Sequence, residues 1–182
     1  MKSSTVVTRS GRHLRVTQCG APEGVPVIFA HGWPCSGSQA LPWHAVAEEL
    51  GLRIIAPDRP GIGGSHFEPG RKLCGWVSLV EEVTLELGVE RFHAVGVSGG
   101  GLYTLALAEA LPERLLSAHV VSGAPCFHLL GGARALPWHY TGLHFLRRLW
   151  PGALVPAFQL GSFLNDRVMS WRLLRWMMKC YL

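Results

Sequence analysis

The residues that could most directly do chemistry form the run GVSGG at positions 96–100, a Gly-x-Ser-x-Gly pattern. An apolar strand pattern over residues 92–97 passes straight into a helical pattern over residues 100–110, which puts Ser98 at the corner between them. A residue at such a corner takes strained dihedrals and projects its side chain outward, and its neighbours must be small. Ser98 is therefore a candidate nucleophile. The pattern alone leaves open a second interpretation, in which the serine only caps the helix.

A nucleophilic serine imposes clear requirements on its surroundings. Its hydroxyl is a poor nucleophile at neutral pH, so an imidazole must take its proton and a carboxylate must orient that imidazole. As the attacked acyl carbon becomes tetrahedral, its oxygen gains negative charge that two backbone N–H groups must stabilise. The helix that follows Ser98 directs unpaired N–H groups and the positive end of its dipole at that point. The chemistry expected here is acyl transfer.

Length, composition and charge limit the classes of protein. The 182 residues suffice for one domain with a proper core, and 48% hydrophobic against 16% charged residues argues against disorder. Residues 134–182 hold seven lysines and arginines and one acid, whereas residues 1–133 hold ten and eleven. The basic residues of the tail alternate with Trp, Leu and Met at helical spacing, which favours a packed amphipathic helix over a nucleic-acid surface. Contact of this tail with an anionic membrane stays open as an alternative.

Cysteine spacing and the N-terminal sequence indicate the compartment. The five cysteines are odd in number and widely spaced without a Cys-x-x-Cys pair, which favours reduced thiols over disulfides or a zinc site: Cys19, Cys35, Cys74, Cys126 and Cys180. The first twelve residues lack the apolar core of a signal peptide. We expect a cytoplasmic protein without a metal. A glycine-rich run over residues 61–64 has His66 where a dinucleotide fingerprint needs its third glycine, and no cofactor is expected.

Strand and helix patterns alternate along most of the chain. Residues 4–8 and 13–18 predict an edge hairpin, residues 25–30, 52–56, 92–97 and 115–121 predict strands, and residues 41–50, 75–87 and 100–110 predict helices. This alternation predicts an α/β fold, with a mostly parallel sheet and helices on both faces. Ligand chemistry in such folds occurs beyond the carboxyl ends of the strands, where Trp33, Asp58 and Ser98 fall.

The pattern changes near residue 126. Residues 127–182 contain no strand pattern and predict two or three helical segments broken by prolines, the last over residues 165–181. We interpret residues 1–126 as the N-terminal part of the core, and residues 127–182 as a helical cap over the strand ends that is itself cut short.

Three motifs in this order resemble the α/β-hydrolase superfamily, in its esterase-like branch with a helical cap. They are HGWP at residues 31–34, APDRPGIGGS at residues 56–65 and GVSGG at residues 96–100. The resemblance covers about residues 12–126 closely and the remainder loosely. It implies that Ser98 is the catalytic nucleophile and that the backbone N–H groups of Trp33 and Gly99 form its oxyanion hole.

The same resemblance assigns supporting roles around this serine. It implies that the ring of His31 braces the loop that also contains Gly32. Asp58 and Arg59 could suggest a catalytic pair, but the resemblance implies that their loop braces the end of a neighbouring strand. It implies that Gly96 and Gly100 provide the space that the corner needs.

The acid and the histidine that follow the nucleophile in this family are not identifiable in the chain. The acids beyond Ser98 are Glu109 and Glu113, at the far end of the helix, and Asp166 in the expected cap. No histidine follows a further strand. Residues 115–121 are apolar like a central strand, yet no strand pattern follows to pair with them, which would leave an exposed edge. We therefore expect a hydrolase fold that is incomplete on its C-terminal side.

These observations predict a cofactor-free serine hydrolase that cleaves an ester or related acyl bond of a small apolar substrate through an acyl-enzyme. Trp33 and the Trp- and Leu-rich cap suggest the apolar pocket. We expect the 182-residue form to be inactive or very weak. The alternative is a non-catalytic binding protein or a defective fragment of a hydrolase. Substrate identity and oligomeric state are not specified by the sequence.

Overall fold

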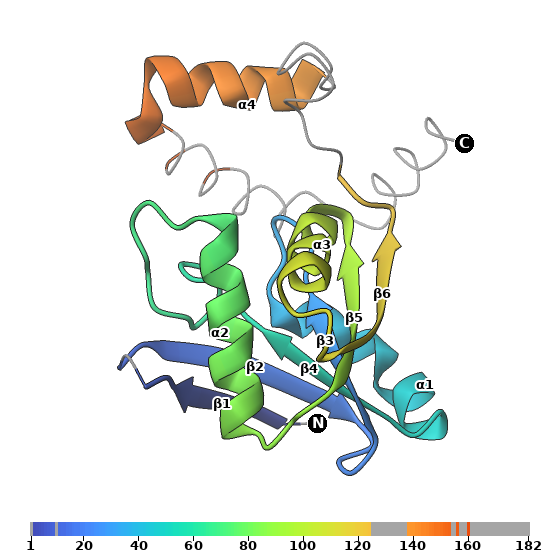
Figure 1. Ribbon diagram of the computed structural model, residues 1–182. Helices are drawn as coiled ribbons and strands as arrows, with labels where there is room; N and C mark the ends of the chain where they lie inside the picture. The colour runs from blue at the N-terminus through green and yellow to red at the C-terminus, as the bar shows by residue number, and fades with distance from the viewer. Residues whose placement is uncertain (1, 10, 125–137, 154–155, 157–159, 161–182) are drawn as a thin grey trace, which may run out of the picture. The chain divides into compact units, whose positions relative to one another are not determined.

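The computed structural model describes residues 2–9, 11–124, 138–153, 156 and 160 (Figure 1). The chain divides into two compact units, Met1–Pro125 and Cys126–Leu182. In these described segments, no helix has both the length and the apolar character needed to cross a membrane.

The first unit is built on a six-stranded sheet with the order β1-β2-β4-β3-β5-β6. The strands are β1 (Lys2–Val7), β2 (His13–Gly20), β3 (Val25–Ala30), β4 (Leu52–Pro57), β5 (Phe92–Val97) and β6 (Leu115–Val121). Strand β2 pairs antiparallel with β1 and β4, whereas β4, β3, β5 and β6 are mutually parallel. The mostly parallel sheet and the N-terminal hairpin at its edge were both predicted.

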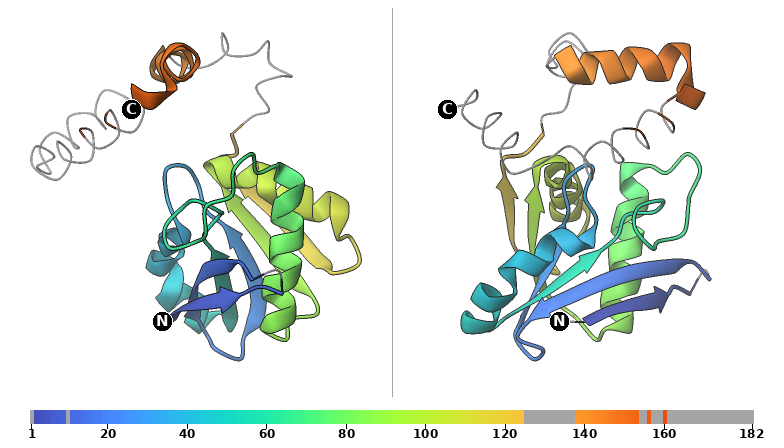
Figure 2. Two further views of the ribbon diagram at one scale, coloured as in Figure 1. Left: turned by 90° about the vertical axis from the view of Figure 1, so that its left-hand side faces the viewer. Right: turned by 180° about the vertical axis from the view of Figure 1, so that it is seen from behind.

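Helices cover both faces of this sheet, as predicted. They are α1 (His44–Glu49), α2 (Leu73–Glu86) and α3 (Gly101–Ala110), with the short 3-10 helices η1 (Gly37–Trp43) and η2 (Ser98–Gly100). Figure 2 shows α1, in cyan, on the opposite side of the sheet from α2, in green.

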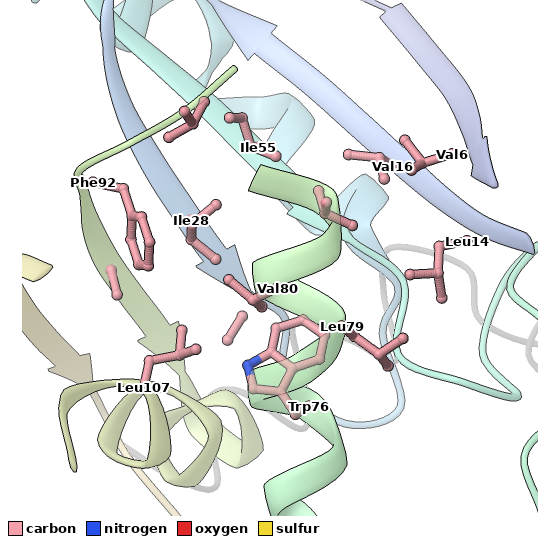
Figure 3. Packing of buried hydrophobic residues seen from close by; sticks show 14 residues of the cluster. Val6, Leu14, Val16, Ile28, Ile55, Trp76, Leu79, Val80, Phe92 and Leu107 are labelled. Atoms are coloured by element: carbon pink, nitrogen blue, oxygen red, sulfur yellow. The ribbon is translucent and has the colours of Figure 1, made fainter. Parts of the chain in front are cut away.

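The larger hydrophobic core lies between the sheet and the α2–α3 pair. In Figure 3, Trp76, Leu79 and Val80 project from α2 into a cluster that includes Ile28 of β3 and Ile55 of β4. These α2 residues recur at the three- and four-residue spacing of one helical face, so a single stripe of the helix is buried. The face predicted from the sequence is the one that packs.

A smaller hydrophobic core lies between α1 and the sheet. It includes Phe29 of β3, Ile54 of β4 and Ala47 of α1. Beside it, an apolar groove of about 280 Å³ runs between α1 and the sheet, as far as Val97 and Val121. β6 is the outermost strand of the described sheet, and its residues Leu116, Val120 and Val121 are exposed. This is the exposed apolar edge expected from the sequence.

One predicted helix differs in form. The helix expected over residues 41–50 begins earlier, as the 3-10 turns of η1, and becomes α-helical only at His44. Pro42 lies inside η1, where it has no N–H to donate and disfavours α-helical dihedrals at Leu41. The end of the helix follows the prediction, because Gly51 takes a left-handed φ of 64° directly after it.

The second unit contains α4 (Trp138–Leu149) and the 3-10 helix η4 (Pro151–Ala153). The break at Pro151 agrees with the predicted interruption of the helical segments. The helix expected over residues 165–181 lies outside the described residues, and the role of this unit as a cap stays a prediction.

Candidate active site

Ser98 lies at the corner between β5 and α3 with a left-handed backbone φ of 53°. In the described part of the chain, Ser122 is the only other non-glycine residue with positive φ. An L-residue pays about 1–2 kcal/mol for this conformation, so the surrounding structure must enforce it. Neither η2 nor α3 receives a capping hydrogen bond from a side chain. Ser98 is therefore the strained corner residue that the pattern predicted and does not serve as a helix cap.

Two glycines make the corner possible. A β-carbon on Gly100 would come within 1.9 Å of the carbonyl oxygen of Ala30, and one on Gly96 would come within 2.4 Å of the Thr104 Oγ1. Neither approach is sterically possible, since real β-carbons do not come under 3.0 Å. Small residues are thus required on both sides of Ser98 because the end of β3 and the first turns of α3 lie too close for a side chain.

The loop after β3 lies directly against the serine corner. A β-carbon on Gly32 would lie 3.4 Å from the Ser98 Cβ, and one on Gly99 would lie 3.6 Å from the backbone nitrogen of Trp33. The structure therefore brings together Ser98 and the two residues whose N–H groups were predicted to form an oxyanion hole. Trp33 is 44% exposed beside them.

Hydrogen bonds fix both peptide units of Gly32. Its N–H donates to Gln39 Oε1 at 2.7 Å, and its carbonyl oxygen accepts from His31 Nδ1 at 2.9 Å and from Arg59 Nη2 at 2.9 Å. Since a carbonyl can only accept, Nδ1 of His31 must be the protonated ring nitrogen. The loop is held from three sides.

The His31 ring is fully buried and has both nitrogens engaged. Its Nε2 accepts from the backbone N–H of Arg59 at 3.2 Å. Burial, followed by the charge of Arg59, lowers the pKa of His31 to about 4, so the ring is neutral at neutral pH. With Nε2 already accepting a hydrogen bond, this histidine is not available as a base for Ser98, which agrees with the bracing position predicted for it.

Asp58 organises the loop after β4. Its Oδ1 accepts from Gly37 N at 2.6 Å and its Oδ2 from Gly64 N at 3.1 Å, while its side chain and backbone together are only 2% exposed. A β-carbon on Gly63 would come within 1.9 Å of Oδ2. The carboxylate thus ties η1 to the glycine-rich loop.

Arg59, which together with Asp58 could suggest a catalytic pair, lies instead against the backbone carbonyls of the loop after β3. It is 3% exposed, and its guanidinium donates to the carbonyl oxygens of both His31 and Gly32. The guanidinium carbon lies 4.7 Å from the centroid of the Tyr103 ring. Burial lowers the pKa of Arg59 to about 10, which still leaves it charged at neutral pH. The motif identified Asp58 and Arg59 together, but no local pattern shows that the arginine side chain turns inward.

The acid and histidine of a serine triad are not placed at Ser98 by the described residues. Glu109 and Glu113 are exposed at or beyond the far end of α3, and Asp166 lies outside the described residues. His93 is hydrogen-bonded to Ser117 at 2.7 Å, near the start of β5 and about 16 Å from the serine corner at 3.3 Å per strand residue. In the part of the chain that the structure describes, no histidine is hydrogen-bonded to Ser98.

The chain is similar to known proteins. Residues 25–151 match the model of the alpha/beta hydrolase fold family. The chain is 34% identical over 108 residues to a pimeloyl-[acyl-carrier protein] methyl ester esterase of Aeromonas salmonicida (strain A449), which is 58% of this chain and 40% of that protein. It is 33% identical over 123 residues to a non-heme chloroperoxidase of Streptomyces lividans, covering 66% of this chain and 45% of the relative.

A solved structure also matches this chain. The hypothetical protein PA1622 from Pseudomonas aeruginosa PAO1 matches with a TM-score of 0.60 and 32% identity, over 74% of this chain and 50% of that one. The chain thus spans half or less of the length of all three proteins. Because the family match covers most of the chain, this protein belongs to the α/β-hydrolase family, as its three sequence motifs predicted.

Proposed function

We propose that the chain carries the nucleophile and the oxyanion hole of a serine hydrolase that cleaves an ester or related acyl bond of a small apolar substrate. The observation that carries the proposal is the left-handed φ of 53° at Ser98, in contact with the loop that contains Gly32 and Trp33. Backbone strain of this kind persists only where the surrounding structure imposes it, and it concentrates at functional sites.

The reaction follows from this geometry. The Ser98 oxygen attacks the acyl carbon, and the carbonyl oxygen of the substrate takes up negative charge. Donation from the backbone N–H groups of Trp33 and Gly99 would stabilise that charge. Collapse of the tetrahedral species breaks the bond to the leaving alcohol, which takes the proton that Ser98 has lost, and forms the acyl-enzyme. Water then releases the acid and restores the serine hydroxyl.

Two observations support an ester of an apolar acid as the substrate class. The methyl ester esterase among the relatives is named for ester cleavage. Trp33 exposes 44% of its surface beside Ser98 and provides an apolar wall for the acyl group.

The base is the component that this part of the fold does not place at Ser98. Since an oxyanion hole and binding leave only a small residual rate without it, we expect ester turnover by the 182-residue chain close to background. The alternative function, a non-catalytic binder, is favoured by the same observation.

Labelling with a fluorophosphonate separates the two functions, because it requires a reactive serine and an oxyanion hole but no turnover. We expect slow labelling of the wild-type chain, increasing toward one phosphonyl group per chain by intact mass, and none in Ser98→Ala. Folded wild-type protein that reacts no faster than Ser98→Ala would favour the binder.

A further inference from the structure

We propose that Arg59 is a positioning residue for the oxyanion hole, which acts through the peptide bond between Gly32 and Trp33. The inference rests on the proposed function, because the hole matters only if negative charge develops beside Ser98. It adds a residue outside the nucleophile, the two N–H donors and their glycines.

The geometry of one peptide links Arg59 to the N–H of Trp33. The carbonyl oxygen of Gly32 and the N–H of Trp33 belong to one planar trans peptide and point in opposite directions. Fixing the direction of the oxygen therefore fixes the direction of the N–H. Arg59 Nη2 donates to this oxygen at 2.9 Å. Arg59 thus sets the direction of the Trp33 N–H, the candidate oxyanion donor, from the opposite side of the peptide and without contacting the substrate.

The arrangement around this peptide leaves it little freedom. The second terminal nitrogen of Arg59 holds the preceding carbonyl, that of His31, so one planar guanidinium spans two successive peptide oxygens. Gln39 holds the N–H of Gly32 at 2.7 Å. Tyr103 of α3 packs against the guanidinium, which ties its position to the helix that starts behind the serine.

The charge of Arg59 also acts on the N–H of Trp33. A charged donor on a peptide oxygen draws electron density toward that oxygen and leaves the N–H of the same peptide a stronger donor. His31 donates to the same oxygen at 2.9 Å but is neutral, because burial lowers its pKa to about 4. The positive charge on this contact therefore comes from Arg59.

A second arginine offers a matched control. Arg114 also donates to two successive carbonyl oxygens, those of Val89 at 2.7 Å and Glu90 at 3.0 Å, and its guanidinium carbon lies 5.6 Å from the centroid of the Phe92 ring. It sits at the opposite end of β5 from Ser98. Both arginines brace two successive peptide carbonyls, but only Arg59 contacts the peptide that contains a candidate oxyanion donor.

The test compares Arg59→Met, Arg59→Lys and Arg114→Met in the full chain, at a temperature where all are folded. Fluorophosphonate labelling is measured over a range of probe concentrations to separate the maximal rate from half-saturation. Arg59→Met is expected to lower the maximal rate about tenfold, less than the loss of an oxyanion donor, without changing half-saturation. Arg59→Lys recovers part of the rate, because it keeps one charged donor, and Arg114→Met stays within about twofold of wild type. Equal rate losses in Arg59→Met and Arg114→Met would show that Arg59 has only a structural role and would overturn the proposal.

Failure of the wild-type chain to be labelled would count against the proposed function itself. A second measurement tests the positioning role of Arg59 even in that case. The amide resonance of Trp33 in a ¹H–¹⁵N correlation spectrum should move upfield in the proton dimension in Arg59→Met and stay in place in Arg114→Met. An unmoved Trp33 resonance in Arg59→Met would overturn the positioning role whatever the labelling shows.

Discussion

Gly32 and Ser98 lie side by side at the ends of two neighbouring strands: a β-carbon on Gly32 would lie only 3.4 Å from the Cβ of Ser98. Gly32 follows β3 and Ser98 follows β5, and these strands pair in parallel. Since parallel strands end at the same edge of the sheet, the loop after β3 and the serine meet there although they lie far apart in sequence. Ser98 takes a left-handed backbone φ of 53° at this point.

The strain at Ser98 can be measured by comparing two variants that both remove the hydroxyl. Ser98→Gly should be more stable than Ser98→Ala by about 1 kcal/mol, because glycine adopts a φ of 53° without steric cost. Urea denaturation of both proteins provides the measurement.

Ser117 supplies the control for this comparison. It lies within β6, where its backbone is extended, so Ser117→Gly should be less stable than Ser117→Ala, by about 0.5–1 kcal/mol. The same order of stabilities at both positions would show that Ser98 carries no backbone strain.

The close approach of Gly100 to β3 predicts a large effect from one methyl group. Gly100→Ala should lower the free energy of unfolding by about 3 kcal/mol, because its β-carbon would come within 1.9 Å of the Ala30 carbonyl oxygen. Gly99→Ala is the matched variant at the next position, where the nearest atoms lie 3.6 Å away, an ordinary contact. It should stay within about 0.5 kcal/mol of wild type. Similar losses in the two variants would argue against so close an approach of Gly100 to the end of β3.

The buried, neutral state of His31 predicts a pH dependence of stability. The unfolded chain binds a proton at this histidine near pH 6.5, whereas the folded pKa is about 4. The unfolded state therefore gains protons first as the pH falls, and wild-type stability should drop by about 3 kcal/mol between pH 7 and pH 4 relative to His31→Gln. Comparing denaturant midpoints of the two proteins cancels the contribution of the other eight histidines. Parallel pH profiles would contradict a depressed pKa.

Much of the fold could be predicted because its signals are local. The buried strands are short apolar runs, the packed stripe of α2 follows helical spacing, and Gly51 marks the end of α1. The prediction missed the 3-10 character of residues 37–43, because a proline changes the hydrogen-bonding pattern there without interrupting the apolar one.

The site residues could be predicted only where a sequence motif reflects a special backbone conformation or a close approach of two backbone segments. Ser98 has a left-handed φ. Gly96 and Gly100 on either side of it, and Gly63 beside Asp58, occupy positions where a β-carbon would clash. Arg59 is held by contacts with Gly32 and Tyr103, which are distant in sequence, and an arginine in a loop is usually exposed. Periodicity and spacing contain no record of such contacts.

The central claim is that Ser98 attacks an acyl carbon in front of the N–H groups of Trp33 and Gly99. A crystal structure of the phosphonylated chain tests it most directly, since the phosphoryl oxygen occupies the place of the oxyanion. We predict phosphorus bonded to Ser98 Oγ, with its oxygen about 2.7–3.1 Å from both backbone nitrogens. A phosphonyl group on another residue, or an oxygen on Ser98 turned away from both nitrogens, would contradict the account.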